Sequence, residues 1–162
     1  MGTKTTGILT ADMKRVVDEQ RLGFVATVCP DGTPNLSPKG TTAVWDDDHL
    51  AFANIRSAGT LANLRHNPVV EVNVVDPIVR RGYRFKGTAS VLESGEVYDR
   101  AIGFYKARGS RVSAIREIVL IRVTAAQPLD SPAYDFGATE EDVCDRWERH
   151  YASLRSERRR RE

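Results

Sequence analysis

The chain has 162 residues, of which 41% are hydrophobic and 28% are charged, and its formal net charge at pH 7 is +2. This length allows one domain with a sizeable core and hardly allows two. The apolar runs are shorter than the roughly 20 residues of a membrane-spanning helix. The first residues lack the apolar core of a secretory signal, and two cysteines are too few for a disulfide framework. We therefore expect a cytoplasmic protein whose residues 1–162 form a single domain.

The positive charge is concentrated at one end of the sequence. Residues 155–162, RSERRRRE, hold five arginines and two glutamates, a local net charge of +3, so the remainder of the chain carries −1. Such a run can bind nucleic acid. A solvated helix end is the commoner meaning of a charged run, and we favour it here.

The first half of the sequence predicts one helix followed by three strands. Thr10 is placed to cap a helix over about residues 11–20, in which Met13, Val16 and Val17 share one face. The turn PDGT joins the first two strands into a hairpin. The strands are expected at residues 22–29, 35–45 and 50–54.

The second half alternates helices and strands. A short helix over about 58–66 ends at Asn67-Pro68. Ser94 can cap a helix over about 95–108. Thr139 opens a helix over about 139–158 in which Val143, Trp147, Tyr151 and Leu154 recur at helical spacing, and we expect this stripe to pack on the body while the helix covers the barrel or a partner subunit. Strands are expected at 69–76, 82–93 and 118–129. Six strands with peripheral helices predict a mainly antiparallel β-barrel.

The motifs of many enzyme classes are absent from the sequence. The histidines His49, His66 and His150 lie far apart and do not form a metal-ligand pair. Neither cysteine belongs to a CxxC pair, and the sequence has no GxSxG, GxxxxGK or GxGxxG motif. We therefore expect no metal site, and no residue can be assigned a catalytic role.

Two short polar segments interrupt the apolar pattern. SPKGTT, residues 37–42, places a lysine and several hydroxyls within a strand. NIRSAGT, residues 54–60, precedes a helix whose N-terminal N–H groups and partial positive charge can hold a phosphate, and Gly59 would let a ligand approach the backbone. The alternative makes Ser57 a helix cap and Lys39 a surface cation. The pattern alone favours neither reading.

The ordered segments of the chain resemble the FMN-binding split-barrel family of pyridoxamine 5′-phosphate oxidase-like proteins. The resemblance rests on VATVCPDGTPNLSPKGTTAVWDDDHLAFANIRSAGTLANLRHNPVVEVNVV followed by RRGYRFKGTA, and it covers about residues 20–130. It implies a six-stranded antiparallel split β-barrel that carries FMN at a homodimer interface. The aromatic residues Trp45, Phe52, Tyr83 and Phe85 are candidate contacts between the subunits of such a dimer, and the alternative places them in the core.

The resemblance also implies a set of cofactor-binding residues. Lys39, Arg56, Ser57 and Thr60 would hold the phosphate, beside Gly59 at the helix start. Arg81 would approach from the second subunit. The residues expected to border the ribityl chain and the flavin ring are Ser37, Pro38, Gly40, Thr41 and Asn54.

The sequence departs from the true oxidase in two places. Gly82 stands where the oxidase has a flavin-contacting glutamine, and the C-terminal region that reads the vitamin B6 phosphate has no counterpart. We therefore expect a flavin-dependent oxidoreductase with a different small-molecule redox partner. Alternatives are a non-catalytic flavin-binding protein or electron carrier, and a split-barrel protein that binds haem or a deazaflavin (coenzyme F420).

Overall fold

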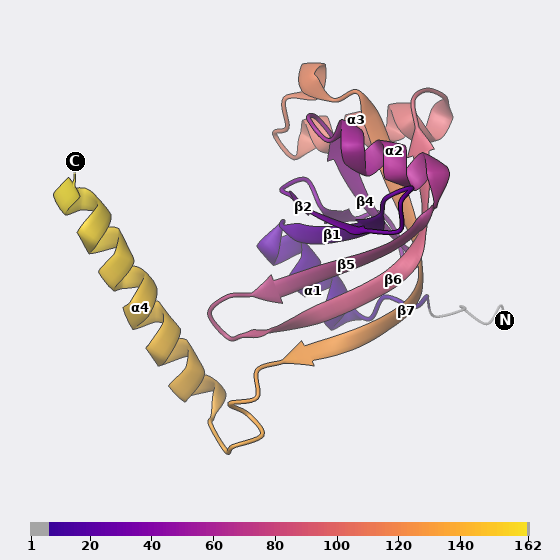
Figure 1. The fold of residues 1–162 in the computed structure, drawn as a ribbon. Coiled ribbons are helices and arrows are strands. Elements are labelled where there is room, and N and C mark those ends of the chain that lie inside the picture. The colour runs from indigo at the N-terminus through magenta and orange to yellow at the C-terminus, as the bar shows by residue number, and fades with distance from the viewer. Residues whose placement is uncertain (1–6, 162) are drawn as a thin grey trace, which may run out of the picture.

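The structure is a computed structural model that describes residues 7–161 (Figure 1). Residues 1–6 and residue 162 lie outside the described part, and so does most of the N-terminal segment that was expected to lack a secretory signal. Seven strands form a single sheet surrounded by helices. The helices are α1 (Ala11–Gln20), α2 (Ala58–His66), α3 (Glu96–Ala107), α4 (Glu140–Arg161) and the short 3-10 helix η1 (Val112–Ala114). The strands are β1 (Gly23–Val28), β2 (Pro34–Lys39), β3 (Ala43–Val44), β4 (His49–Asn54), β5 (Val69–Asp76), β6 (Arg81–Leu92) and β7 (Glu117–Asp130).

The sheet is a curled antiparallel sheet with the strand order β2-β1-β5-β6-β7-β4-β3. This confirms the mainly β split-barrel prediction, with seven strands in place of six. The seventh arises because the predicted strand 35–45 is interrupted after Lys39. Residues 40–42 carry the chain from the β2 edge to the β3 edge, and Thr42 N donates to Lys39 O at 3.3 Å. The two edges of the sheet therefore meet next to Lys39.

The main core lies inside the curl and is covered by α1 and α2. Side chains from both helices pack against strand residues, of which Phe52 and Phe85 are 0% and 1% exposed. These two aromatic residues therefore belong to the core, and the expectation that they form a subunit contact is wrong. The helix members of the core are Val16, Val17, Leu61 and Leu64.

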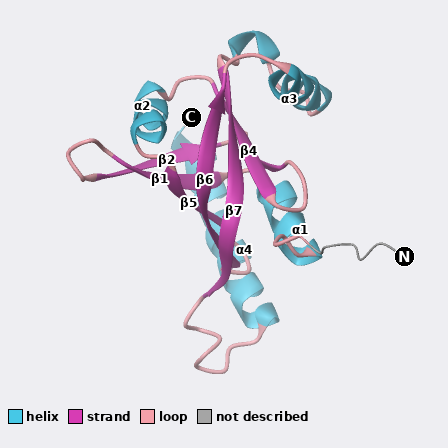
Figure 2. Ribbon diagram, turned by 90° about the vertical axis from the view of Figure 1, so that its right-hand side faces the viewer, coloured by secondary structure: helices cyan, strands magenta, loops and turns pink. Residues whose placement is uncertain are grey.

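A second, smaller core lies under α3. It contains the buried residues Ala53, Ala101, Tyr105, Ile115 and Ile118. Burial raises the pKa of Tyr105, whose hydroxyl donates to Thr41 O at 3.0 Å. Helices α2 and α3 lie toward the same end of the sheet (Figures 1 and 2). The N-cap of α3 is Gly95 and no side chain caps it, so the prediction that Ser94 caps this helix is wrong.

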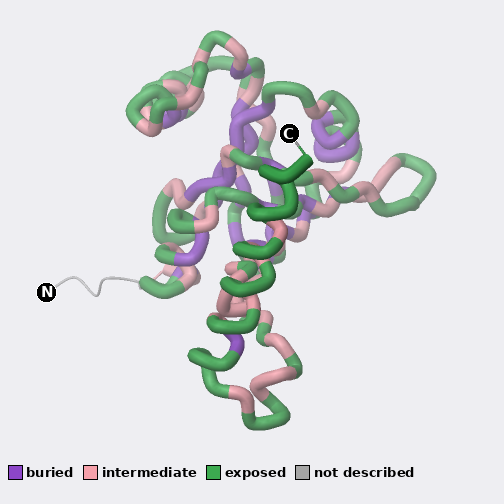
Figure 3. Tube along the Cα trace, turned by 90° about the vertical axis from the view of Figure 1, so that its left-hand side faces the viewer, coloured by how far each residue is buried: buried purple, intermediate pink, exposed green. Residues whose placement is uncertain are grey.

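Helix α4 extends away from the sheet instead of packing along it (Figures 1 and 3). Only Val143 of its apolar stripe is buried. Trp147 stacks under the Arg80 guanidinium at 3.4 Å, whereas Tyr151 and Leu154 stay half-exposed. The prediction that the whole stripe packs on the body is therefore wrong within one chain, and its packing on a partner subunit stays a prediction. No helix among residues 7–161 is both long and apolar enough to cross a membrane.

Candidate functional site

The two polar segments predicted from the sequence meet at the ammonium group of Lys39. Its Nζ donates to Ser37 Oγ at 2.5 Å, to Ser57 Oγ at 2.7 Å and, more weakly, to Thr60 Oγ1 at 3.4 Å. The Phe52 ring lies 5.7 Å from the same nitrogen. Because alternate residues of β2 point to opposite faces, Ser37 and Lys39 both face α2. We call Ser37, Lys39, Asn54, Ser57 and Thr60 the Lys39 cluster.

The Lys39 cluster holds a buried positive charge without a carboxylate partner. Lys39 is 4% exposed, and the described residues provide three hydroxyls and no ion pair for its ammonium. Burial lowers the pKa of Lys39. Removing a charge from water costs free energy unless an opposite charge or several hydrogen bonds compensate it. The cluster is therefore electrostatically suited to an anion.

The start of α2 is also left open to a ligand. Ser57 occupies the N-cap position, yet its hydroxyl accepts from Lys39 and makes no cap hydrogen bond to the helix. No side chain caps the first N–H groups of the nine-residue helix, and a Cβ added at Gly59 would meet nothing within 4 Å. Ser57 thus stands at the N-cap position without capping the helix through its side chain. Uncapped N–H groups and the helix dipole favour a bound anion.

Asn54 fixes the turn that joins the strand to this helix. Its Oδ1 accepts from Ser57 N at 2.8 Å, and its Nδ2 donates to Glu117 Oε2 at 2.6 Å. The residue is 4% exposed. Both polar atoms of Asn54 are therefore engaged, and its side chain fixes the position of Ser57 N.

The remaining predicted residues are spread around this cluster. Thr41 binds the main chain of β4, with Oγ1 at 3.0 Å from Ala53 O and 2.9 Å from Ala53 N. Pro38 lies on the opposite face of β2 from Lys39, beside Phe24 of β1. Gly40 and Arg56 are exposed on either side of the cluster. Within one chain the fold therefore brings Lys39 together with the hydroxyls of the Lys39 cluster, whereas Pro38 lies on the other face of the strand.

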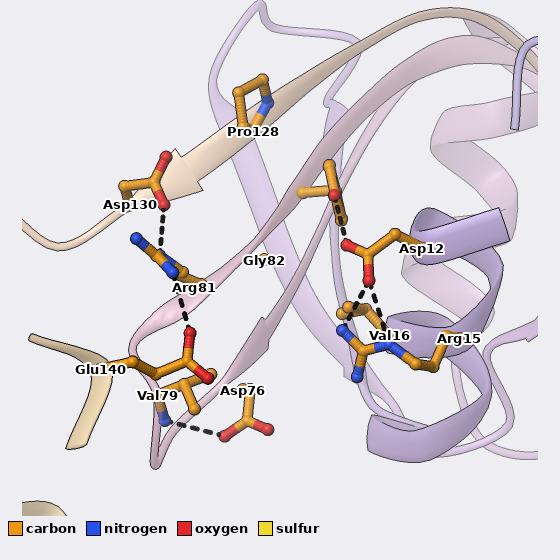
Figure 4. A pocket seen from close by; sticks show the side chains of 11 residues that line it. Asp12, Arg15, Val16, Asp76, Val79, Arg81, Gly82, Pro128, Asp130 and Glu140 are labelled. Carbon is orange, nitrogen blue, oxygen red and sulfur yellow. Dashed lines mark hydrogen bonds and ion pairs between the residues drawn. The ribbon is translucent and has the colours of Figure 1, made fainter. Parts of the chain in front are cut away.

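Arg81 is the first residue of β6 and lies away from the Lys39 cluster. It forms ion pairs of 2.9 Å with Asp130 and Glu140, and its guanidinium stacks on Tyr134 at 3.7 Å. Arg81, Asp130 and Glu140 border a cavity of about 300 Å³, which the ion-paired Asp12 and Arg15 also line (Figure 4). Within one chain Arg81 therefore joins β6 to the start of α4. Its contact with a cofactor in a second subunit stays a prediction.

Gly82, which borders the same cavity, has a steric role in the sheet. A Cβ at this position would lie 2.0 Å from Val74 O of the neighbouring strand. The larger side chain of a glutamine would therefore displace the backbone of β5 or β6. The flavin-contacting glutamine of the true oxidase does not fit here without such a shift.

A second pocket adjoins the Lys39 cluster and contains residues that the sequence did not single out. It has a volume of about 400 Å³, and three arginines surround it together with one carboxylate, that of Glu117. Arg65 and Arg116 were missed because they lie 51 positions apart in the sequence, and only the pairing of β4 with β7 brings them together. We call it the arginine pocket; it is lined by Asn54, Ile55, Arg56, Ser57, Ala58, Leu61, Arg65, Arg116 and Glu117.

Several solved structures are similar to this chain. HupZ of Group A Streptococcus is 31% identical, with 75% of this chain and 94% of that chain covered and a TM-score of 0.68. An F420 reductase is 25% identical, covering 73% of this chain and 98% of that chain with a TM-score of 0.58. An FMN-binding protein of Syntrophomonas wolfei is 16% identical, with 76% of this chain and 87% of that chain covered. Its TM-score of 0.64 shows that it shares the fold.

Among curated proteins the chain has no match. A family profile described as pyridoxamine 5′-phosphate oxidase matches residues 9–130, which include the whole curled sheet and the Lys39 cluster. Together with the identity to HupZ, this match places the chain in a family. The chain belongs to the pyridoxamine 5′-phosphate oxidase-like, flavin-binding family of split barrels.

Proposed function

We propose that this protein binds FMN, with the phosphate at the Lys39 cluster, and acts as an oxidoreductase on a small redox partner. The observation that carries the proposal is the buried Lys39 ammonium, which faces hydroxyls and no carboxylate beside an uncapped helix start. A phosphate dianion would compensate both positive charges. When bound, the flavin supplies the electron transfer, and the protein's residues bind and orient it.

The proposal includes a homodimer around the cofactor. The outer face of β1, β2 and β5 exposes Phe24, Leu36 and Val69, which are 42%, 66% and 59% accessible. The strand register places these side chains on one face, away from Lys39. Neighbouring apolar side chains exposed to water are typical of an interaction surface. A second copy on this face would cover them and enclose a groove of about 460 Å³.

The alternatives are haem, a deazaflavin, and a flavin held without catalysis. No histidine lines the Lys39 cluster or the arginine pocket among the described residues, so neither site offers an imidazole to a haem iron. The F420 reductase is named for a deazaflavin coenzyme, and that coenzyme would present a phosphate to the same cluster. An electron carrier would use the same binding residues without a site for a second substrate.

The proposal is tested by native mass spectrometry and absorption spectroscopy of freshly purified protein. We expect a dimer that carries the mass of FMN and a flavin spectrum. A haem spectrum, or a monomer that takes up no flavin at micromolar concentration, would overturn the proposal. Stopped-flow reduction by NADH, NADPH and reduced deazaflavin then separates an oxidoreductase from an electron carrier, because only the former reacts with a dedicated donor.

A further inference from the structure

The arginine pocket brings three guanidinium groups together from three parts of the chain. Arg56 lies in the turn before α2, Arg65 in its last turn, and Arg116 directly before β7. Arg116 N donates to Asn54 O at 3.0 Å, which fixes the start of β7 beside the turn. Leu61 of α2 is buried beneath the pocket and is 1% exposed. The positions of the three backbones are therefore set by the fold.

The charges of this pocket are not balanced by the protein. Glu117 is the single carboxylate among its lining residues, and its Oε2 already accepts from Asn54 at 2.6 Å. Its Oε1 lies 3.6 Å from Arg65, which also binds Glu93. For Arg56 and Arg116 the described residues provide no ion pair. Counting Glu117 and the Glu93 that pairs with Arg65, three arginines and two glutamates leave a net charge of +1. Guanidinium groups in such a cluster are the preferred ligands of phosphate and carboxylate.

The pocket is continuous with the Lys39 cluster through two shared residues. Ser57 lines the pocket, while its hydroxyl accepts from Lys39 at 2.7 Å. Asn54 likewise lines the pocket and positions Ser57 N. An anion at the Lys39 cluster therefore lies next to the entrance of the arginine pocket. A second anionic group joined to the first would enter that pocket without a change in the fold.

We propose that the arginine pocket binds a second anionic group, a phosphate or a carboxylate, beyond the phosphate held at the Lys39 cluster. This inference rests on the proposed function and names the ligand class more closely. The preferred ligand is then a flavin or deazaflavin with an anionic extension, or a flavin together with a separate anionic molecule. The shared chemistry is a second negative charge, which the guanidinium group of Arg116 binds because it has no ion pair of its own among the described residues.

The experiment compares ligands that differ in the second anionic group. FMN, FAD and coenzyme F420 are titrated into flavin-free protein in about 0.15 M salt, where weak surface effects are screened. Inorganic pyrophosphate is titrated by calorimetry into both flavin-free and FMN-loaded protein. Arg116→Gln is the test variant, because its side chain is exposed and has no ion partner in the described structure. Arg146→Gln on α4, also exposed, is the matched control.

We expect FAD or F420 to bind at least tenfold more tightly than FMN, and Arg116→Gln to abolish most of that advantage. One charge-assisted hydrogen bond corresponds to about a tenfold change in affinity. FMN affinity should stay within about twofold in this variant, and Arg146→Gln should change nothing. If instead pyrophosphate binds FMN-loaded protein and Arg116→Gln removes that binding, the second anion comes from a separate molecule.

Two results would overturn the inference. One is equal affinity for FMN, FAD and F420 together with no pyrophosphate binding. The other is an equal loss for all ligands in Arg116→Gln, which would make Arg116 part of the first phosphate site. If no flavin binds at all, the proposed function fails, and the effect of Arg116→Gln on pyrophosphate binding to the flavin-free protein still decides whether the arginine pocket holds an anion.

Discussion

Replacing Lys39 by methionine should change ligand binding and stability in opposite directions. Methionine keeps the length of the stem beside the Phe52 ring and removes the ammonium. In the wild type that ammonium makes bonds of 2.5 and 2.7 Å to Ser37 and Ser57 and would be the strongest cation available to a phosphate. A charge-assisted hydrogen bond contributes about 1.5–3 kcal/mol. Lys39→Met should therefore weaken FMN binding roughly ten- to a hundredfold.

The flavin-free protein should respond differently to the same substitution. Lys39 is 4% exposed and its charge has no carboxylate partner among the described residues, so its burial costs free energy in the absence of a ligand. Replacing a buried charge by an apolar side chain of similar shape is often neutral or stabilising. We expect the melting temperature of flavin-free Lys39→Met to equal or exceed that of the wild type.

The pH dependence follows from the lowered pKa of Lys39, which burial moves below its ordinary value of 10.5. Between the folded and unfolded pKa values the unfolded chain binds more protons. The stability of the flavin-free protein therefore rises with pH across that interval. Below the interval the full free-energy cost of burying the charged ammonium lowers the stability. In the proposed function FMN binds the protonated form of Lys39, so the FMN affinity should fall as the pH rises through the folded pKa. Lys39→Met should lack this alkaline loss.

The assay is quenching of FMN fluorescence during titration of flavin-free protein, combined with thermal melts with and without FMN. Lys106→Met on α3 is the matched control, because that lysine is exposed and remote from the cluster. An unchanged dissociation constant for Lys39→Met would refute the phosphate site. A large fall in the stability of the flavin-free variant would show instead that Lys39 serves the fold.

Three further predictions test other parts of the molecule. Gly59→Ala should stabilise the flavin-free protein by up to about 1 kcal/mol, because alanine favours a helix interior. The same change should weaken FMN binding about tenfold, because the added methyl group crowds the uncapped N–H groups. The control Gly103→Ala on α3, also in open space, should stabilise the protein without affecting FMN binding. Leu36→Asp should shift light scattering from dimer to monomer, because this 66% exposed side chain lies on the proposed interface; an intact dimer would exclude that face. Deleting residues 155–162 should change the free energy of unfolding by less than about 0.5 kcal/mol, because this helix end is exposed, and lost folding would contradict it.

Local chemistry determined several elements that the sequence predicted closely. Helix α1 spans Ala11–Gln20 as expected, with the Thr10 hydroxyl accepting from Met13 N at 3.3 Å. Helix α2 ends at His66, directly before Asn67-Pro68. Caps and proline act within a few residues of their own position, so their effects are readable without the fold. The order of strands and turns likewise sufficed to indicate the split barrel and its family.

The tertiary structure decided the features that depend on distant residues. The predicted strand 35–45 breaks after Lys39, because residues 40–42 cross from one edge of the sheet to the other. This crossing brings Lys39 to Ser57, whose hydroxyl accepts from the ammonium and makes no cap hydrogen bond to α2. Arg116 reaches the turn before α2 through the pairing of β4 with β7. Periodicity and capping report on neighbours in sequence, whereas a buried charge and a cluster of arginines arise from contacts made only when the sheet curls.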